Sequence, residues 1–108
     1  MKLLIAIVQD IDADAAGRGL TDEGFSVTRI GSTGGFFRQG NVTLLCGTPD
    51  DRVEDALDVL KRTCEPRTRT IPLNIDASEM LLTAGPTREI RVGGATVFIF
   101  DVERFARY

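Results

Sequence analysis

Residues 41 to 64, NVTLLCGTPDDRVEDALDVLKRTC, hold a strand pattern followed directly by a helix pattern. The first seven residues are mostly apolar and β-branched, which predicts a strand. Thr48 is expected to cap the helix with Pro49 at its first position, and Asp50 and Asp51 suit the positive end of the helix dipole. The helix would then present one apolar stripe at helical spacing, made of Val53, Leu57, Leu60 and Cys64.

The chain before this stretch predicts another strand and another helix. Residues 3–8 form a continuous apolar run that suits a strand buried on both faces. Asp10 or Asp12 is expected to cap a helix that runs to Glu23. Gly24 ends this helix as a glycine just past the last turn.

Two glycines inside the first helix, Gly17 and Gly19, each cost about 1 kcal/mol relative to alanine. Close packing against a sheet or a neighbouring subunit would explain them. Residues 25–31 follow as a strand that pairs antiparallel with the strand opening at Asn41. Alternation divides its side chains between two faces, with Phe25 and Val27 on one and Thr28 and Ile30 on the other.

The second half of the chain is less regular. Residues 65–88 contain three prolines and neither a helix nor a strand period, so we expect a long loop. In the sequence REIRVGGATVFIF, which starts at Arg88, two strand-like runs flank Gly93 and Gly94 and predict a tight hairpin. The element order is therefore β-α-β-β-α-β plus an extra C-terminal hairpin strand. This order predicts a single α+β domain over residues 1–108, ferredoxin-like, with both helices on one sheet face.

Composition excludes several classes of function. The net charge is −3, so we expect neither nucleic-acid binding nor attraction to anionic membranes. The sequence contains no histidine. Cys46 and Cys64 are too few for a zinc site and are expected to be buried thiols rather than a disulfide. The apolar N-terminal run is too short for a membrane span and lacks a cleavage site. We therefore expect a cytoplasmic protein with no metal and no cofactor.

Residues 32–41, STGGFFRQGN, place two phenylalanines in a segment that otherwise indicates a loop. The rings either pack on this or a neighbouring subunit, bind nucleic acid as an aromatic RNA-binding strand does, or form a small nucleotide site. For the last, glycines allow backbone N–H groups to approach a phosphate, an aromatic ring can stack on a purine, and Asn41 can read an adenine edge. No nucleophile has a base beside it, so we do not expect an enzyme.

Four stretches resemble one known family. These are MKLLIAIVQD, STGGFFRQGN with the preceding Thr28, NVTLLCG with the DDRV that follows, and VGGATVF. In this order they resemble the cyclic-di-AMP receptor PstA family of PII-like signalling proteins. The resemblance implies a homotrimer of ferredoxin-like subunits that binds one cyclic dinucleotide in each of three clefts between subunits.

The resemblance also implies which residues bind the ligand. They lie within the matching motifs and are Thr28, Gly35, Phe36, Phe37, Asn41, Gly47 and Phe98. Ser26 departs from the family, which often has a basic residue there, so Arg38 or a neighbouring subunit would have to meet the phosphate. The alternatives are a PII-like trimer for ATP or another adenine nucleotide, and a structural trimer without a nucleotide. The downstream protein partner cannot be read from the sequence.

Overall fold

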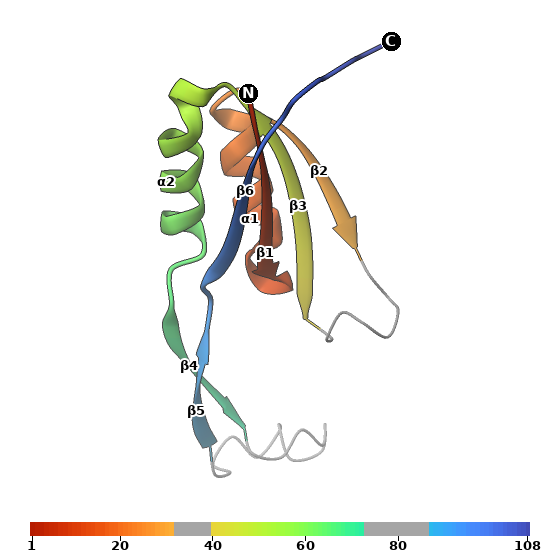
Figure 1. The fold of residues 1–108 in the computed structure, drawn as a ribbon. Coiled ribbons are helices and arrows are strands. Elements are labelled where there is room, and N and C mark those ends of the chain that lie inside the picture. Colours follow the sequence, from red (N-terminus) through yellow and green to blue (C-terminus); the bar gives the residue numbers. More distant parts are fainter. Residues whose placement is uncertain (32–39, 73–86) are drawn as a thin grey trace.

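The computed structural model describes residues 1–31, 40–72 and 87–108 (Figure 1). Helices α1 (Asp10–Asp22) and α2 (Val53–Thr63) lie against one face of a four-stranded sheet. The strand order is β2-β3-β1-β6, and every neighbouring pair is antiparallel. The four strands are β1 (Lys2–Gln9), β2 (Ser26–Gly31), β3 (Asn41–Thr48) and β6 (Ala95–Asp101).

Two crossovers connect this sheet. Strand β1 continues through α1 to β2, and β3 continues through α2 to β6. In each case one strand separates the two that the helix connects, so they run parallel. This is the split β-α-β arrangement, and the predicted ferredoxin-like class is confirmed.

The core lies between the sheet and the two helices. Leu4, Ala6 and Val8 of β1 are at most 2% exposed, whereas the residues between them are only half-buried. The predicted stripe of α2 also faces this core, with Leu60 and Cys64 fully buried there. The remaining buried core positions come from α1, α2, β3 and the residue just before β2: Ala13, Ala16, Leu20, Phe25, Val42, Leu44, Cys46, Ala56 and Val59.

Both predicted helix starts were wrong in detail. Gln9 occupies the capping position of α1 and makes no side-chain cap. Thr48 is the buried last residue of β3, and its hydroxyl donates to the carbonyl of Pro49. Pro49 keeps an extended backbone, with ψ of 151°, and a short 3₁₀ turn η1 (Asp50–Arg52) precedes α2. The end of α1 agrees with the prediction, because Gly24 follows it with φ of +91°.

The two helix glycines have different surroundings. A Cβ at Gly19 would lie 2.9 Å from Cγ1 of Val59, so this glycine allows α1 and α2 to approach closely. A Cβ at Gly17 would meet no described atom within 4 Å. Within the subunit, helix–helix packing rather than the expected contact with the sheet explains Gly19, and packing of Gly17 against another subunit stays a prediction.

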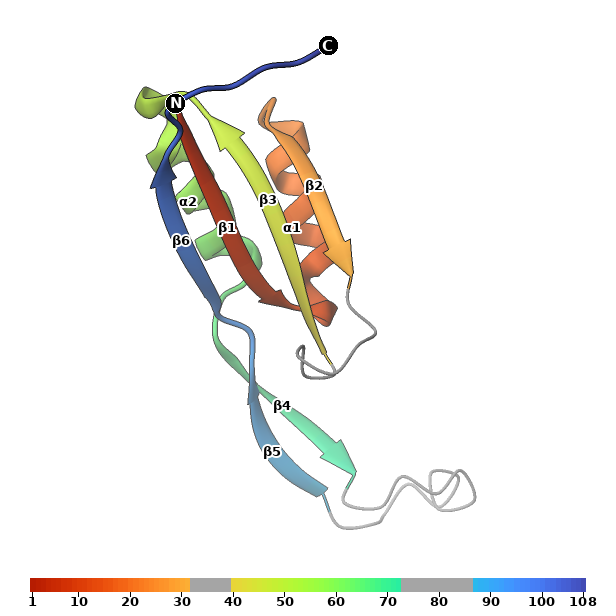
Figure 2. The same ribbon diagram turned by 45° about the vertical axis from the view of Figure 1, so that its right-hand side comes forward.

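The segment predicted as a long loop over 65–88 contains two strands instead. Strands β4 (Arg67–Pro72) and β5 (Thr87–Val92) pair antiparallel in a ribbon that we call the arm, which projects beyond the sheet (Figure 2). The predicted hairpin between β5 and β6 was wrong, because β5 pairs with β4 while β6 pairs with β1. Gly93 and Gly94 do have positive φ, at +90° and +87°, but they carry the chain from the arm into the main sheet.

The C-terminal tail, residues 102–108, follows β6. Val102 and Phe105 stand at helical spacing, but these seven residues, all of them described, form no helix. The tail leaves the edge of the sheet and crosses the end of β3 towards β2 (Figures 1 and 2).

The root of the arm is tied to the first turn of α1. Arg67 donates two hydrogen bonds to Asp12, at 2.8 Å from Nη2 to Oδ1 and 3.4 Å from Nη1 to Oδ2. The carboxylate is only 4% exposed, and this hydrogen bond raises the pKa of the Arg67 guanidinium. The backbone N–H of Gly93 donates to the side-chain oxygen of Gln9 at 2.8 Å. The role expected for Asp12, a helix cap, is thus replaced by a contact with the arm.

Candidate functional site

The sheet face opposite the helices, which we call the helix-free face, brings several predicted site residues together. Thr28 pairs with Leu45 of β3. Phe98 pairs with Ile5 of β1, and its side chain is 48% exposed. Because Leu45 and Ile5 are themselves partners, one row of side chains crosses the sheet from Thr28 to Phe98. Gly47 lies two residues along β3 and faces the same side.

A cavity of about 630 Å³ adjoins this row beneath the C-terminal tail. We call it the tail cavity. Ser26, Thr28 and Gly47 line it from the sheet, and Phe105 and Arg107 line it from the tail. Two predicted site residues, Thr28 and Gly47, thus share a cavity with Ser26, the position where the sequence departs from the family that it resembles.

Asn41 lies on the same face but at the opposite end of β3. It is six positions away from Gly47, which corresponds to about 20 Å along a strand. Asn41 instead lines two smaller cavities beside the root of the arm, of about 340 and 310 Å³. Arg69 of the arm lines the second of these. The structure therefore does not bring Asn41 together with Gly47 on one subunit.

Three predicted contacts, Gly35, Phe36 and Phe37, lie outside the described residues, as does Arg38. The described backbone resumes at Gly40, whose carbonyl accepts a hydrogen bond of 2.6 Å from the N–H of Asp10. This bond joins the end of the 32–41 segment to the start of α1, next to Asn41.

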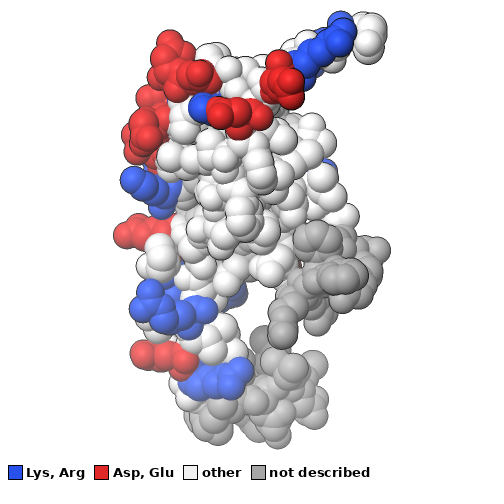
Figure 3. Space-filling view, viewed as in Figure 1, with Lys and Arg blue, Asp and Glu red and all other residues white. Residues whose placement is uncertain are grey.

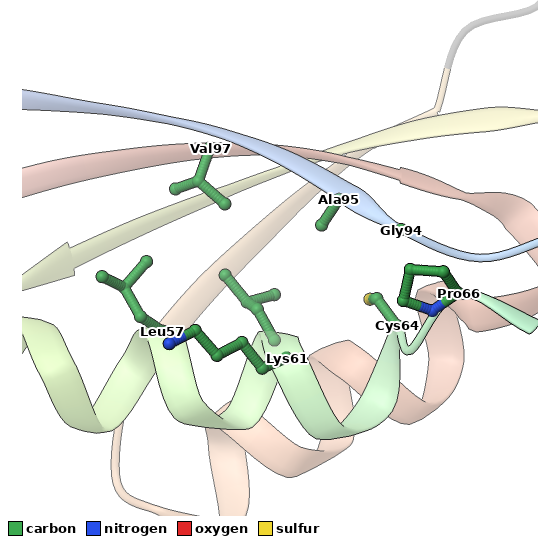
Figure 4. A pocket seen from close by; sticks show the side chains of 8 residues that line it. Leu57, Lys61, Cys64, Pro66, Gly94, Ala95 and Val97 are labelled. Atoms are coloured by element: carbon green, nitrogen blue, oxygen red, sulfur yellow. The ribbon is translucent and has the colours of Figure 1, made fainter.

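A further cavity, of about 470 Å³, lies on the helix side of the sheet (Figure 4). Leu57 of α2, Cys64 just after this helix and Val97 of β6 point into it, and Lys61 lies along its rim. None of the predicted site residues that the structure describes lines it. Burial raises the pKa of the Cys64 thiol, which keeps it protonated near neutral pH. Cys46 is likewise a buried free thiol with a pKa raised by burial, so the two expected thiols are confirmed.

Charge is unevenly distributed over the surface. In Figure 3 acidic side chains gather over α2 and basic ones lie near the arm, while the middle of the view, over the sheet, is mostly uncharged. The basic residues nearest the tail cavity on β1 and β2 have acidic partners. Lys2 is paired with Asp101, and Arg29 donates to Asp14.

The lining of the tail cavity suits binding rather than catalysis. It offers a hydroxyl from Thr28, backbone at Gly47, an aromatic ring and a guanidinium. Among the described residues that line it there is no carboxylate or thiol to act as base or nucleophile. In the same described ranges, no group of three or more histidine, cysteine or acidic side chains could hold a metal ion.

The sequence did not indicate the contribution of the tail. Phe105 and Arg107 sit in a short tail after the last strand, and no motif connected them with Thr28 or Gly47. Likewise, nothing in the sequence linked Arg67 with Asp12, because 55 residues separate them.

A family model described as "Cyclic-di-AMP receptor" matches the whole chain, residues 1–108. The chain belongs to the cyclic-di-AMP receptor family. The resemblance drawn from the four motifs is thereby confirmed. The family is one of receptors and not of enzymes.

A solved structure supports the fold independently. The chain resembles the crystal structure of a functionally unknown protein from Pediococcus pentosaceus ATCC 25745, with a TM-score of 0.76 and 32% sequence identity. The match covers 99% of this chain and 96% of the other. No helix within the described ranges is long and apolar enough to cross a membrane.

Proposed function

We propose that the chain is a cytoplasmic signalling receptor that binds cyclic-di-AMP in clefts between the subunits of a homotrimer and catalyses no reaction. The observation that carries the proposal is the match to the receptor family over residues 1–108. The placement of Thr28, Gly47 and Phe98 on the helix-free face supports it, because that face offers an aromatic ring and polar groups to one ligand. Two free thiols suit a reducing compartment.

The position of Asn41 favours a site between subunits. It lies about 20 Å along β3 from Gly47, because the two are six positions apart in an extended strand. A compact cyclic dinucleotide is shorter than this distance, so it can contact both only if they come from different subunits. Gly35, Phe36 and Phe37 remain predicted contacts from the loop that leads into Asn41.

Calorimetric titration with cyclic-di-AMP, cyclic-di-GMP and ATP tests the proposal. We expect tight binding of cyclic-di-AMP and much weaker binding of the other two. Phe98→Ala should weaken the binding of cyclic-di-AMP about five- to 150-fold if the Phe98 ring stacks on a base. Asn41→Ala should weaken the binding of cyclic-di-AMP by a similar factor, because a hydrogen-bonding edge of adenine would be left unpaired.

The alternatives are distinct outcomes of the same titration. Equal binding of the two cyclic dinucleotides would contradict an adenine-reading site. Preference for ATP would identify a different adenine nucleotide as the ligand. No binding of any of the three by a folded protein would favour a purely structural assembly.

A further inference from the structure

The tail cavity brings the C-terminal tail against the candidate ligand residues. Figures 1 and 2 show the tail leaving β6 and crossing the end of β3 towards β2. In that course Phe105 and Arg107 form one wall of the cavity, opposite Thr28 and Gly47. The tail is therefore part of the site and not only an extension beyond the last strand.

Few charged groups belong to the residues that line this cavity. Arg107 supplies the one ionisable side chain among the described residues that line it, and the α-ammonium of Met1, which also lines it, is paired with Asp50 at 2.7 Å. Arg107 makes no ion pair with any other residue in the described part of the chain. Lys2 and Arg29 differ, because they are held by Asp101 and Asp14 and belong to the opposite face of their strands.

A cyclic dinucleotide brings two negatively charged phosphodiesters into any site that holds it. An arginine matches a phosphate with two parallel N–H donors, and such charge-assisted bonds are shorter and stronger than neutral ones. The wall formed by Ser26, Thr28 and Gly47 offers no charge to balance the phosphates. Among the described residues that line this cavity, the positive charge without an acidic partner is the guanidinium of Arg107.

We propose that Arg107 binds a phosphodiester of the ligand and supplies from the tail the positive charge that β2 lacks at Ser26. This inference rests on the proposed function, since it names the anion contact of the same site. Thr28 and the backbone at Gly47 then orient the ligand beside that charge, and Phe105 closes the apolar side of the cavity.

The test compares two arginines of the same tail. Arg107→Gln should bind cyclic-di-AMP about tenfold or more weakly than the parent, because a hydrogen bond to a charged group is lost. The affinity of Arg107→Lys should lie between those of the parent and Arg107→Gln, since lysine keeps the charge and loses the bidentate hydrogen-bonding geometry. Arg104→Gln is the matched control, because Arg104 is exposed in the same tail and does not line the cavity. It should bind like the parent.

Salt dependence separates a charge contact from a structural effect. Raising the salt from about 50 to about 500 mM should weaken the parent's binding clearly and that of Arg107→Gln much less, because screening acts on the lost charge. All variants should keep the parent's melting temperature. If the parent binds cyclic-di-AMP but Arg107→Gln matches Arg104→Gln in affinity and salt slope, the inference is overturned and the proposed function stands. If the parent binds no cyclic dinucleotide, both fall.

Discussion

Gly17 and Gly19 have opposite structural roles although they are two residues apart in one helix. An alanine at Gly19 would press on Val59, which is 3% exposed and has little room to move. We expect Gly19→Ala to lower the free energy of unfolding by about 1–3 kcal/mol. Gly17→Ala meets no described atom, so it should raise that free energy by about 0.5–1 kcal/mol through helix propensity. Urea denaturation of both variants measures this, and changes of the same sign would contradict the difference in packing.

The candidate site shows which residues a sequence can reveal. Thr28, Gly47 and Phe98 belong to strands, and strand alternation alone places their side chains on a face. Their shared face could therefore be predicted once the strand order was known. Arg107 could not, because an extended tail has no periodicity and its position depends on where the chain turns after β6.

Helices and strands were predicted correctly where the local sequence pattern alone determines them. The two helices and the four main strands follow from apolar periodicity and from Gly24, and the ferredoxin-like order follows from their sequence. The pairing of β5 was predicted wrongly. Two adjacent glycines indicate a turn with positive φ, but they do not indicate which strand the chain joins after the turn. The helix starts were predicted wrongly because the two residues expected to cap them have other roles in the folded chain. Thr48 is the last residue of β3, and Asp12 accepts hydrogen bonds from Arg67.

The bond between Asp12 and Arg67 is expected to hold the arm. Arg67→Ala should lower the free energy of unfolding by about 1–3 kcal/mol, because it leaves a buried carboxylate without its partner. Hydrogen exchange of the β4 amides should also accelerate, while that of the β1 amides should change little.

Arg29→Ala is a suitable control for this variant. It removes a similar ion pair, but the partner, Asp14, is 79% exposed. Water replaces the lost contact there, so we expect a change of about 0–0.5 kcal/mol. Equal losses in the two variants would mean that the burial of Asp12 does not matter.

The assembled protein is expected to bury the helix-free face. Phe98 and Phe100 of β6 and Ile30 of β2 are between 43% and 51% exposed on it, beside the half-buried apolar residues of β1. Large contiguous apolar surfaces of this kind mark interaction sites. We predict a trimer without ligand, so light scattering should give three times the chain mass of 11.8 kDa.

Neighbouring residues of β6 allow a sharper test of which face is buried. Phe100 is 51% exposed on the helix-free face, and Ile99 is 45% exposed on the opposite face, where its partner is the buried Leu4. Phe100→Glu would place a charge in the interface without a partner and should dissociate the trimer. Ile99→Glu adds the same charge at nearly the same exposure and should leave the trimer intact. A parent protein at 11.8 kDa, or equal dissociation by the two variants, would show that the helix-free face does not form the interface.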